Sequence, residues 1–198
     1  MREGRVIVVT GTPGVGKSTV ARLLAQRLGA ELIELGDLVR REGLYSGIDP
    51  ETGSLLVDTG LLADRVAKLV FSEPGKLFVI VGHYAQEVVP SDLLLMAFVL
   101  RREPRELKEV LASRGYSGRK LYENLQAEIL DVCLYEAVEA YGPDRVYEVD
   151  VTGKRPEDVA EELLVALRTR RGRVGLVDWL GKLAEEESLE EFFPLDLP

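Results

Sequence analysis

Short apolar runs alternate along the chain with stretches in which apolar residues recur every three or four positions. The runs have the length and β-branched content of buried strands, and they cover residues 6–10, 31–34, 77–81, 95–101 and 146–150. Helical spacing follows residue 17 and returns over 37–42, 61–71, 103–114 and 121–141, then again after Pro156. Strands that alternate with helices form a parallel sheet covered on both faces. The pattern therefore predicts an α/β fold with a five-stranded parallel sheet.

A glycine-rich segment joins the first predicted strand to the first predicted helix. Residues 11–18 read Gly-Thr-Pro-Gly-Val-Gly-Lys-Ser, which fits the P-loop pattern Gly-x4-Gly-Lys-Ser/Thr. The glycines of such a loop let backbone N–H groups wrap a phosphate at the positive end of a helix. Lys17 is expected to reach the β- and γ-phosphates, and the Ser18 hydroxyl to ligate Mg²⁺. The order of strand, loop and helix therefore predicts binding of ATP or a similar nucleoside triphosphate.

The composition limits the classes of protein that fit. The 198 residues suit one medium-sized domain, with 46% hydrophobic and 30% charged residues. With 25 basic and 34 acidic residues the formal net charge is −9, which argues against strong binding to nucleic acid or anionic membranes. No apolar run has membrane-spanning length and no signal sequence precedes the first strand, so we expect a cytoplasmic protein. Cys133, the single cysteine, is expected to be buried rather than reactive.

Two further segments narrow the choice among P-loop proteins. The Asn-Lys-x-Asp sequence with which GTPases read guanine is missing. Gly36, Asp37 and Arg40 follow the second strand, where small kinases bind the acceptor, and Arg114 lies between two helices, where they place a lid. A lid arginine neutralises charge on the transferred phosphoryl group, and a closed lid excludes water. The positions predict an acceptor-binding insert at about residues 34–57 and a lid at about 113–123.

The chain resembles adenylate kinase isoenzyme 6, the coilin-interacting nuclear ATPase family, and most closely its archaeal branch. The resemblance is carried by residues 11–18, 36–38, 99–101, 114–117 and 123–129, in the same order. It implies a P-loop NTPase fold with a nucleoside monophosphate kinase-like core over residues 1–170. Residues 171–198 would then form a C-terminal helix and an acidic tail.

The resemblance also implies an activity, ligands and a partner. Family members transfer phosphate from ATP to AMP, hydrolyse ATP, and bind the ribosomal protein uS11 as assembly factors of the small ribosomal subunit. The implied nucleotide-binding residues are Gly14, Val15, Gly16, Lys17, Ser18, Thr19 and Arg114. Lys17, Arg114 and His83 are the expected catalytic residues, with Ser18 as the metal ligand. Gly36, Asp37 and Arg40 are expected to bind the acceptor.

Three positions qualify this expectation. The third strand runs into Gly82-His83 without the carboxylate that usually helps to hold Mg²⁺. Either Ser18, the phosphates and water molecules hold the ion by themselves, or Asp37 or Glu87 replaces the missing carboxylate. Val110 stands where related kinases often carry a second arginine, four residues before the lid arginine. His83, the only histidine, follows a strand end where ligands bind in such folds, and both a structural role and a role in orienting water or the acceptor phosphate fit.

The C-terminal region has two interpretations. A basic hinge of four arginines precedes Trp179 and a glutamate-rich end; the arginines are Arg168, Arg170, Arg171 and Arg173. One interpretation is a surface helix followed by a frayed, solvated tail. The other is a contact for a basic partner, with Trp179, Phe192 and Phe193 as anchors. We expect the core to fold without the residues that follow Arg173.

Two functional hypotheses result. The first is an adenylate kinase-type phosphotransferase that converts ATP and AMP to two ADP. The second is an ATP-switched factor that binds uS11, in which hydrolysis resets a complex and phosphoryl transfer is secondary. The missing strand-end carboxylate and the unusual tail favour the second. A kinase for another small acceptor is a third and weaker alternative.

Overall fold

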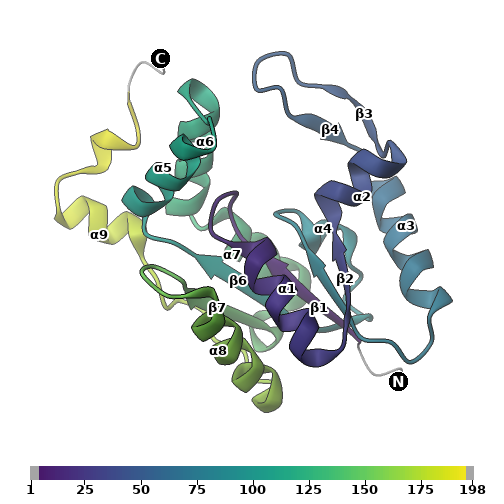
Figure 1. The fold of residues 1–198 in the computed structure, drawn as a ribbon. Helices are drawn as coiled ribbons and strands as arrows, with labels where there is room; N and C mark the ends of the chain where they lie inside the picture. Colours follow the sequence, from purple (N-terminus) through teal and green to yellow (C-terminus); the bar gives the residue numbers. More distant parts are fainter. Residues whose placement is uncertain (1–4, 195–198) are drawn as a thin grey trace.

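A parallel sheet of five strands forms the centre of the molecule (Figure 1). The computed structural model describes residues 5–194. The strands lie in the order β2-β5-β1-β6-β7, and every neighbouring pair is parallel. Their bounds are β1 Val6–Thr10, β2 Glu31–Glu34, β5 Phe78–Val81, β6 Leu94–Arg101 and β7 Val146–Asp150. The predicted α/β fold and its five strands are confirmed.

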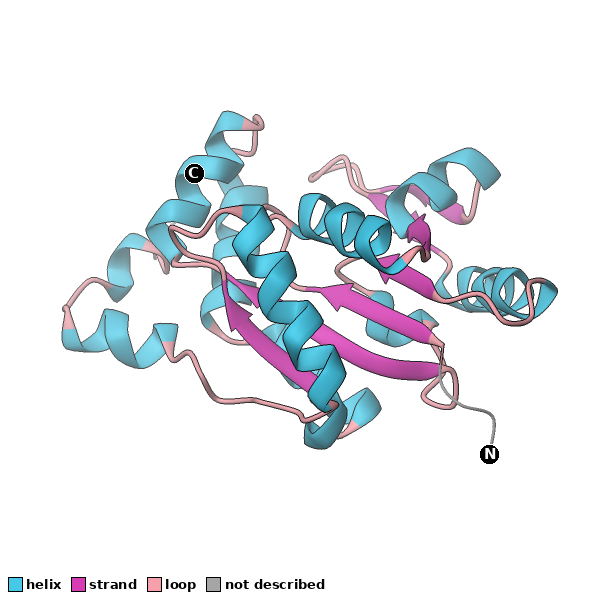
Figure 2. Ribbon diagram, turned by 60° about the horizontal axis from the view of Figure 1, so that its bottom comes forward, coloured by secondary structure: helices cyan, strands magenta, loops and turns pink. Residues whose placement is uncertain are grey.

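Helices cover both faces of the sheet, because successive side chains of a strand point to opposite faces (Figure 2). Ile7 and Val9 of β1 belong to the core that includes the helices on one face, α1 (Lys17–Leu28) and α8 (Pro156–Thr169). Val6 and Val8 belong to the core on the other face. That face carries α2 (Leu35–Glu42), α3 (Thr59–Ser72), α4 (Ala85–Val88) and α7 (Val132–Tyr141). All five side chains of β1 are fully buried, as a central strand requires.

Two arms rise above the strand ends on opposite sides of the P-loop (Figure 1). One is an antiparallel hairpin of β3 (Tyr45–Ile48) and β4 (Leu55–Val57). The other consists of α5 (Pro104–Ser113) and α6 (Gly118–Ile129). The sequence pattern does not predict the hairpin, because its strands are only four and three residues long and none of their residues is buried.

The prediction of one helix over residues 121–141 is wrong. The chain forms α6 and α7 instead, which are separated at Asp131, a residue with a left-handed φ of 58°. The guanidinium of Arg101 donates to the backbone oxygen of Glu128 at 2.8 Å and contacts the Asp131 carboxylate. One of the last carbonyls of α6 is therefore used by a side chain from β6, and the helix ends there.

The C-terminal segment packs against the domain as far as residue 194: the expected surface helix is present, but the segment after it is not detached, and residues 195–198 of the predicted tail lie outside the described residues. It contains α9 (Trp179–Glu185) and a 3-10 turn at Leu189–Glu191, whereas the other 3-10 turn, Pro143–Arg145, lies between α7 and β7. Trp179 is 7% exposed and Phe192 is fully buried, both in the core that contains α5 and α6, with Phe193 partly buried beside them. An apolar side chain that is buried in its own domain leaves no free anchor for a partner. In residues 5–194, no helix is long and apolar enough to cross a membrane.

Candidate active site

The P-loop adopts a conformation that only glycine tolerates at its key positions. Gly11, Gly14 and Gly16 have φ values of 131°, 96° and 99°. A Cβ at Gly11 would lie 2.4 Å from the Leu100 carbonyl oxygen, and one at Gly14 would lie 2.8 Å from Leu107 Cδ1. Gly16 caps α1 without a side-chain acceptor, so the first N–H groups of the helix are left for another partner. The loop is thus built for an anion at the helix N-terminus.

The Lys17 ammonium is folded onto the loop that carries it. Its Nζ donates to the backbone oxygens of Gly11 at 2.6 Å and Thr12 at 2.8 Å. Burial is the main reason why the pKa of Lys17 falls to about 8; Cys133 and Glu128 act to raise it, and Arg114 adds a smaller lowering effect. A buried cation held only by carbonyl groups gains from an anion in its vicinity.

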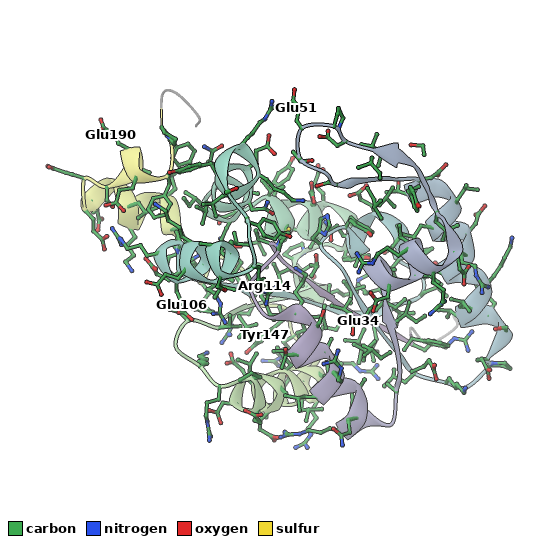
Figure 3. All side chains as sticks on the ribbon, turned by 45° about the horizontal axis from the view of Figure 1, so that its top comes forward. Glu34, Glu51, Glu106, Arg114, Tyr147 and Glu190 are labelled. Atoms are coloured by element: carbon green, nitrogen blue, oxygen red, sulfur yellow. The ribbon has the colours of Figure 1, made fainter. Side chains whose placement is uncertain are left out.

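A cavity of about 700 Å³ lies between the P-loop and the two arms. Most of the residues predicted for the site line it: Gly14, Gly16, Lys17, Ser18, Thr19, Gly36, Arg40, His83 and Arg114. The P-loop thus faces α2 and the hairpin across one continuous space. In Figure 3, Arg114 lies above the start of α1, and Glu51 marks the tip of the hairpin.

Two of the predicted residues do not line the cavity. The Asp37 side chain is 65% exposed and pairs with Arg40 at 2.9 Å. It does not face the cavity because its position on α2 points to a different side of the helix from Gly36 and Arg40. The Val15 side chain is fully buried in the core beneath the loop. Glu87, the other alternative for a metal ligand, is also outside the cavity, and burial together with Glu136 raises its pKa.

The donor set favours a cation held mostly by phosphates and water. Ser18 lines the cavity beside Lys17, and Glu123 is the one carboxylate among the described residues that line it. Across the described part of the chain, no group of three or more His, Cys, Asp or Glu side chains could hold a metal ion. Mg²⁺ usually keeps several waters and binds few protein ligands, so a single hydroxyl beside bound phosphates suits it.

His83 is held by hydrogen bonds to its backbone, with its ring at the cavity. Gln86 Nε2 donates to the His83 carbonyl oxygen at 3.0 Å, and Thr10 Oγ1 donates to Gln86 Oε1 at 2.8 Å. The rings of His83 and Tyr84 meet edge to face, with centroids 4.4 Å apart. Desolvation beside the cavity, and secondly the Lys17 charge, lower the pKa of His83 to about 4, although part of the residue is exposed to solvent. The imidazole is therefore neutral at pH 7.

Several cavity residues were not predicted individually. They lie in the hairpin, after β5 and in the lid, and they are Thr52, Ser54, Leu55, Val57, Tyr84, Tyr116, Lys120, Glu123 and Asn124. Most fall within the predicted insert and lid, but the sequence alone does not distinguish them from the neighbouring residues. The spacing of Lys120, Glu123 and Asn124 is a usable signal, because residues three and four apart share one face of a helix.

Comparisons with known proteins agree with this geometry. A family profile described as an AAA domain matches residues 7–131. A protein of Thermococcus onnurineus named "Putative adenylate kinase" is 43% identical over 175 residues, which cover 88% of this chain and 91% of the relative. A protein of the same name from Methanocaldococcus jannaschii is 36% identical over 184 residues, 93% of this chain and 98% of the relative.

Solved structures of small kinases have the same fold. Shikimate kinase from Acinetobacter baumannii matches with a TM-score of 0.58 and 17% identity, over 84% of this chain and 94% of the kinase. Thymidylate kinase from Candida albicans matches with a TM-score of 0.56 and 18% identity, over 84% and 92%. At such identities the likeness concerns the fold alone. The sequence relatives go further, and by them this chain belongs to the adenylate kinase-like family of P-loop proteins found in these archaea.

Proposed function

We propose that the protein is an adenylate kinase-type phosphotransferase that converts ATP and AMP to two ADP, as a member of the isoenzyme 6 branch. One observation carries the proposal: a single cavity joins the P-loop to Arg40, the hairpin and the lid. Transfer between two nucleotides requires donor and acceptor phosphates in line in one water-excluding space. The names of the archaeal relatives support the same reaction.

The residues of the cavity divide between the two substrates. The P-loop amides, Lys17 and Thr19 bind the triphosphate, and Ser18 would hold Mg²⁺, which would neutralise charge on the phosphates. Arg40 and the backbone at Gly36 bind the AMP phosphate opposite the loop. Arg114 stabilises charge on the transferred group, in the manner of a lid arginine. The neutral ring of His83 orients the acceptor phosphate by a hydrogen bond rather than by proton transfer.

An acceptor panel tests the proposal. Purified protein with Mg-ATP is supplied with AMP, other nucleoside monophosphates, shikimate or gluconate, and the products are separated by chromatography. We expect ADP formation to depend on AMP, and Arg40→Ala to raise KM for AMP more than KM for ATP. Transfer to a different acceptor would refute AMP as the substrate, but the protein would still be a kinase.

On the basis of the family resemblance, we also propose that the protein hydrolyses ATP and binds uS11. The formal charge of −9 suits a basic ribosomal protein as partner. The test is co-purification of purified uS11 with the protein, with and without ATP, together with phosphate release in the absence of AMP. If uS11 does not co-purify with the protein in either condition, the proposed assembly function is wrong.

A further inference from the structure

Lys120 of α6 differs from its neighbour Arg119 in where its charge lies. The Arg119 side chain is 58% exposed and pairs with Glu51 at 2.6 Å and Glu123 at 2.7 Å. Lys120 instead lines the cavity with Lys17 and Arg114. Adjacent residues on a helix point about 100° apart, which places one cation outside the cleft and the other within it.

The Lys120 ammonium is held in place without being neutralised. Its Nζ donates to the backbone oxygen of Thr52 at 2.9 Å, at the tip of the hairpin, and lies 5.2 Å from the centre of the Tyr116 ring. Within residues 5–194 it forms no ion pair with a carboxylate, unlike Lys154, which pairs with Glu162 at 2.9 Å. An ammonium group has three donors, so two remain after the bond to Thr52.

The backbone of Lys120 is also fixed. Asn124 Nδ2 donates to the Lys120 carbonyl oxygen at 2.6 Å, one turn along α6. The far end of the same helix is anchored in a buried ion cluster, where the Glu128 carboxylate accepts from Arg101 at 2.8 Å. A cation on an anchored helix loses little conformational entropy when it binds an anionic ligand. This low entropic cost is a condition for preorganised electrostatic stabilisation.

We propose that Lys120 is a catalytic residue that binds phosphate oxygens where donor and acceptor meet, while one of its N–H groups stays on Thr52. The inference rests on the proposed phosphoryl transfer. In that step an oxygen of the acceptor phosphate bonds to the γ-phosphorus, the bond from the γ-phosphorus to the β–γ bridging oxygen breaks, and ADP leaves. Lys120 neutralises the charge that is spread over the transferred group and the leaving oxygen. Its bond to Thr52 couples closure of the hairpin to the presence of that cation.

Four variants separate the charge of Lys120 from its role as a bridge. Lys120→Ala removes both, Lys120→Gln keeps a donor for Thr52 without charge, and Lys120→Arg keeps the charge. Arg119→Ala is the matched control, because it removes the parallel bridge to Glu51 but no cation of the cavity. Melting temperatures of all four variants verify that they fold.

We expect Lys120→Ala and Lys120→Gln to lower kcat roughly 100-fold or more with small changes in either KM, since loss of one transition-state donor has an effect of this size. Lys120→Arg should recover part of kcat, and Arg119→Ala should leave kcat within about threefold of wild type, as expected of a surface ion pair. Equal effects of Arg119→Ala and Lys120→Ala, or rescue by Lys120→Gln, would overturn the assignment. Absence of AMP-dependent ADP formation by the wild-type protein would overturn the proposed function and this role together, whereas an active wild type with a fully active Lys120→Ala variant overturns only the role of Lys120.

Discussion

The indole Nε1 of Trp179 donates a hydrogen bond to the carboxylate Oε1 of Glu128 at 3.3 Å. The same carboxylate accepts from Arg101 Nε at 2.8 Å and from the backbone N–H of Arg102 at 3.0 Å. The C-terminal helix α9 is therefore attached to the buried end of α6. Further contacts lie at the start of α5, where Arg105 donates to Ser188 Oγ at 2.9 Å and pairs with Glu186 at 2.8 Å.

This attachment predicts that the C-terminal segment stabilises the domain. Trp179→Ala removes a large buried side chain and should lower the free energy of unfolding by about 3–5 kcal/mol. Leu180→Ala, at a neighbouring position that is 41% exposed, serves as the control and should change it by about 1 kcal/mol or less. Urea denaturation followed by circular dichroism measures both values. Equal stability of the two variants would mean that α9 does not contribute to the fold.

The ion cluster around Arg101 predicts a pH-dependent loss of stability. Arg101→Met leaves Glu128 and Glu148 buried without their cation and should cost about 3–5 kcal/mol at pH 7. Burial already raises the pKa of Glu148 in the wild-type protein, so the folded state holds this proton more tightly than the unfolded chain. The deficit of the variant should therefore shrink as the pH falls toward about 4, where carboxyl groups become neutral.

Denaturation of Arg101→Met at pH 7 and at pH 5 measures this difference. Arg155→Met is the control, because Arg155 is 77% exposed and pairs with Asp158 near the surface. Its effect should be about 0–1 kcal/mol at both pH values. A deficit of Arg101→Met that grows as the pH falls would contradict the role of the buried carboxylates.

Nucleotide binding should weaken above the pKa of Lys17. Burial lowers that pKa to about 8, and phosphate binds the charged form. Below pH 8 the affinity for ATP should not depend on this group, and above it Kd should rise by up to about tenfold per pH unit, because binding must take up a proton. Titration calorimetry at pH 7, 8 and 9, in two buffers of different ionisation enthalpy, measures the affinity and the proton uptake. Constant affinity and no uptake at pH 9 would show that Lys17 keeps its proton.

The geometry of the P-loop predicts contrasting effects for two glycine substitutions. Gly14→Ala brings Cβ to 2.8 Å from Leu107 Cδ1 and puts it at a φ of 96°, which L side chains rarely adopt, so the loop or Leu107 must shift and ATP affinity should fall at least roughly tenfold. Gly29→Ala at the end of α1 has a φ of 62° but no atom within 4 Å of the new Cβ. It should cost about 1 kcal/mol of stability and leave ATP affinity unchanged. Fluorescence titration with a labelled ATP analogue compares the two variants, and equal affinities would exclude a rigid loop.

Local patterns predicted the parts of the molecule that depend on neighbouring residues. The β-branched runs identify the five buried strands, and the spacing of Gly14, Gly16 and Lys17 identifies the loop between the first strand and its helix. In both cases the residues that determine the structure lie within a few positions of one another. Their physical cause is therefore visible in the sequence itself.

The features that were missed depend on residues distant in the chain. The break at Asp131 results from Arg101, 30 positions earlier, and the burial of Trp179 involves Glu128, 51 positions earlier. Asp37 follows the glycine that lines the cavity, yet it turns to solvent because its place on α2 sets its direction. Lys120 has the same charge as Arg119, and their different partners in the hairpin, Thr52 and Glu51, are not visible in the sequence. Such tertiary contacts leave no periodic signal.

The central claim is that one cavity holds a nucleotide donor and a nucleotide acceptor and transfers a phosphoryl group between them. Phosphorus NMR of the protein with Mg-ATP and AMP, next to the Lys17→Ala variant, tests it most directly. We predict two ADP formed for each AMP consumed by the wild-type protein, and no detectable transfer by the variant, which lacks the cation for the β- and γ-phosphates. Unchanged ATP and AMP after prolonged incubation, in a protein that binds ATP, would contradict the account.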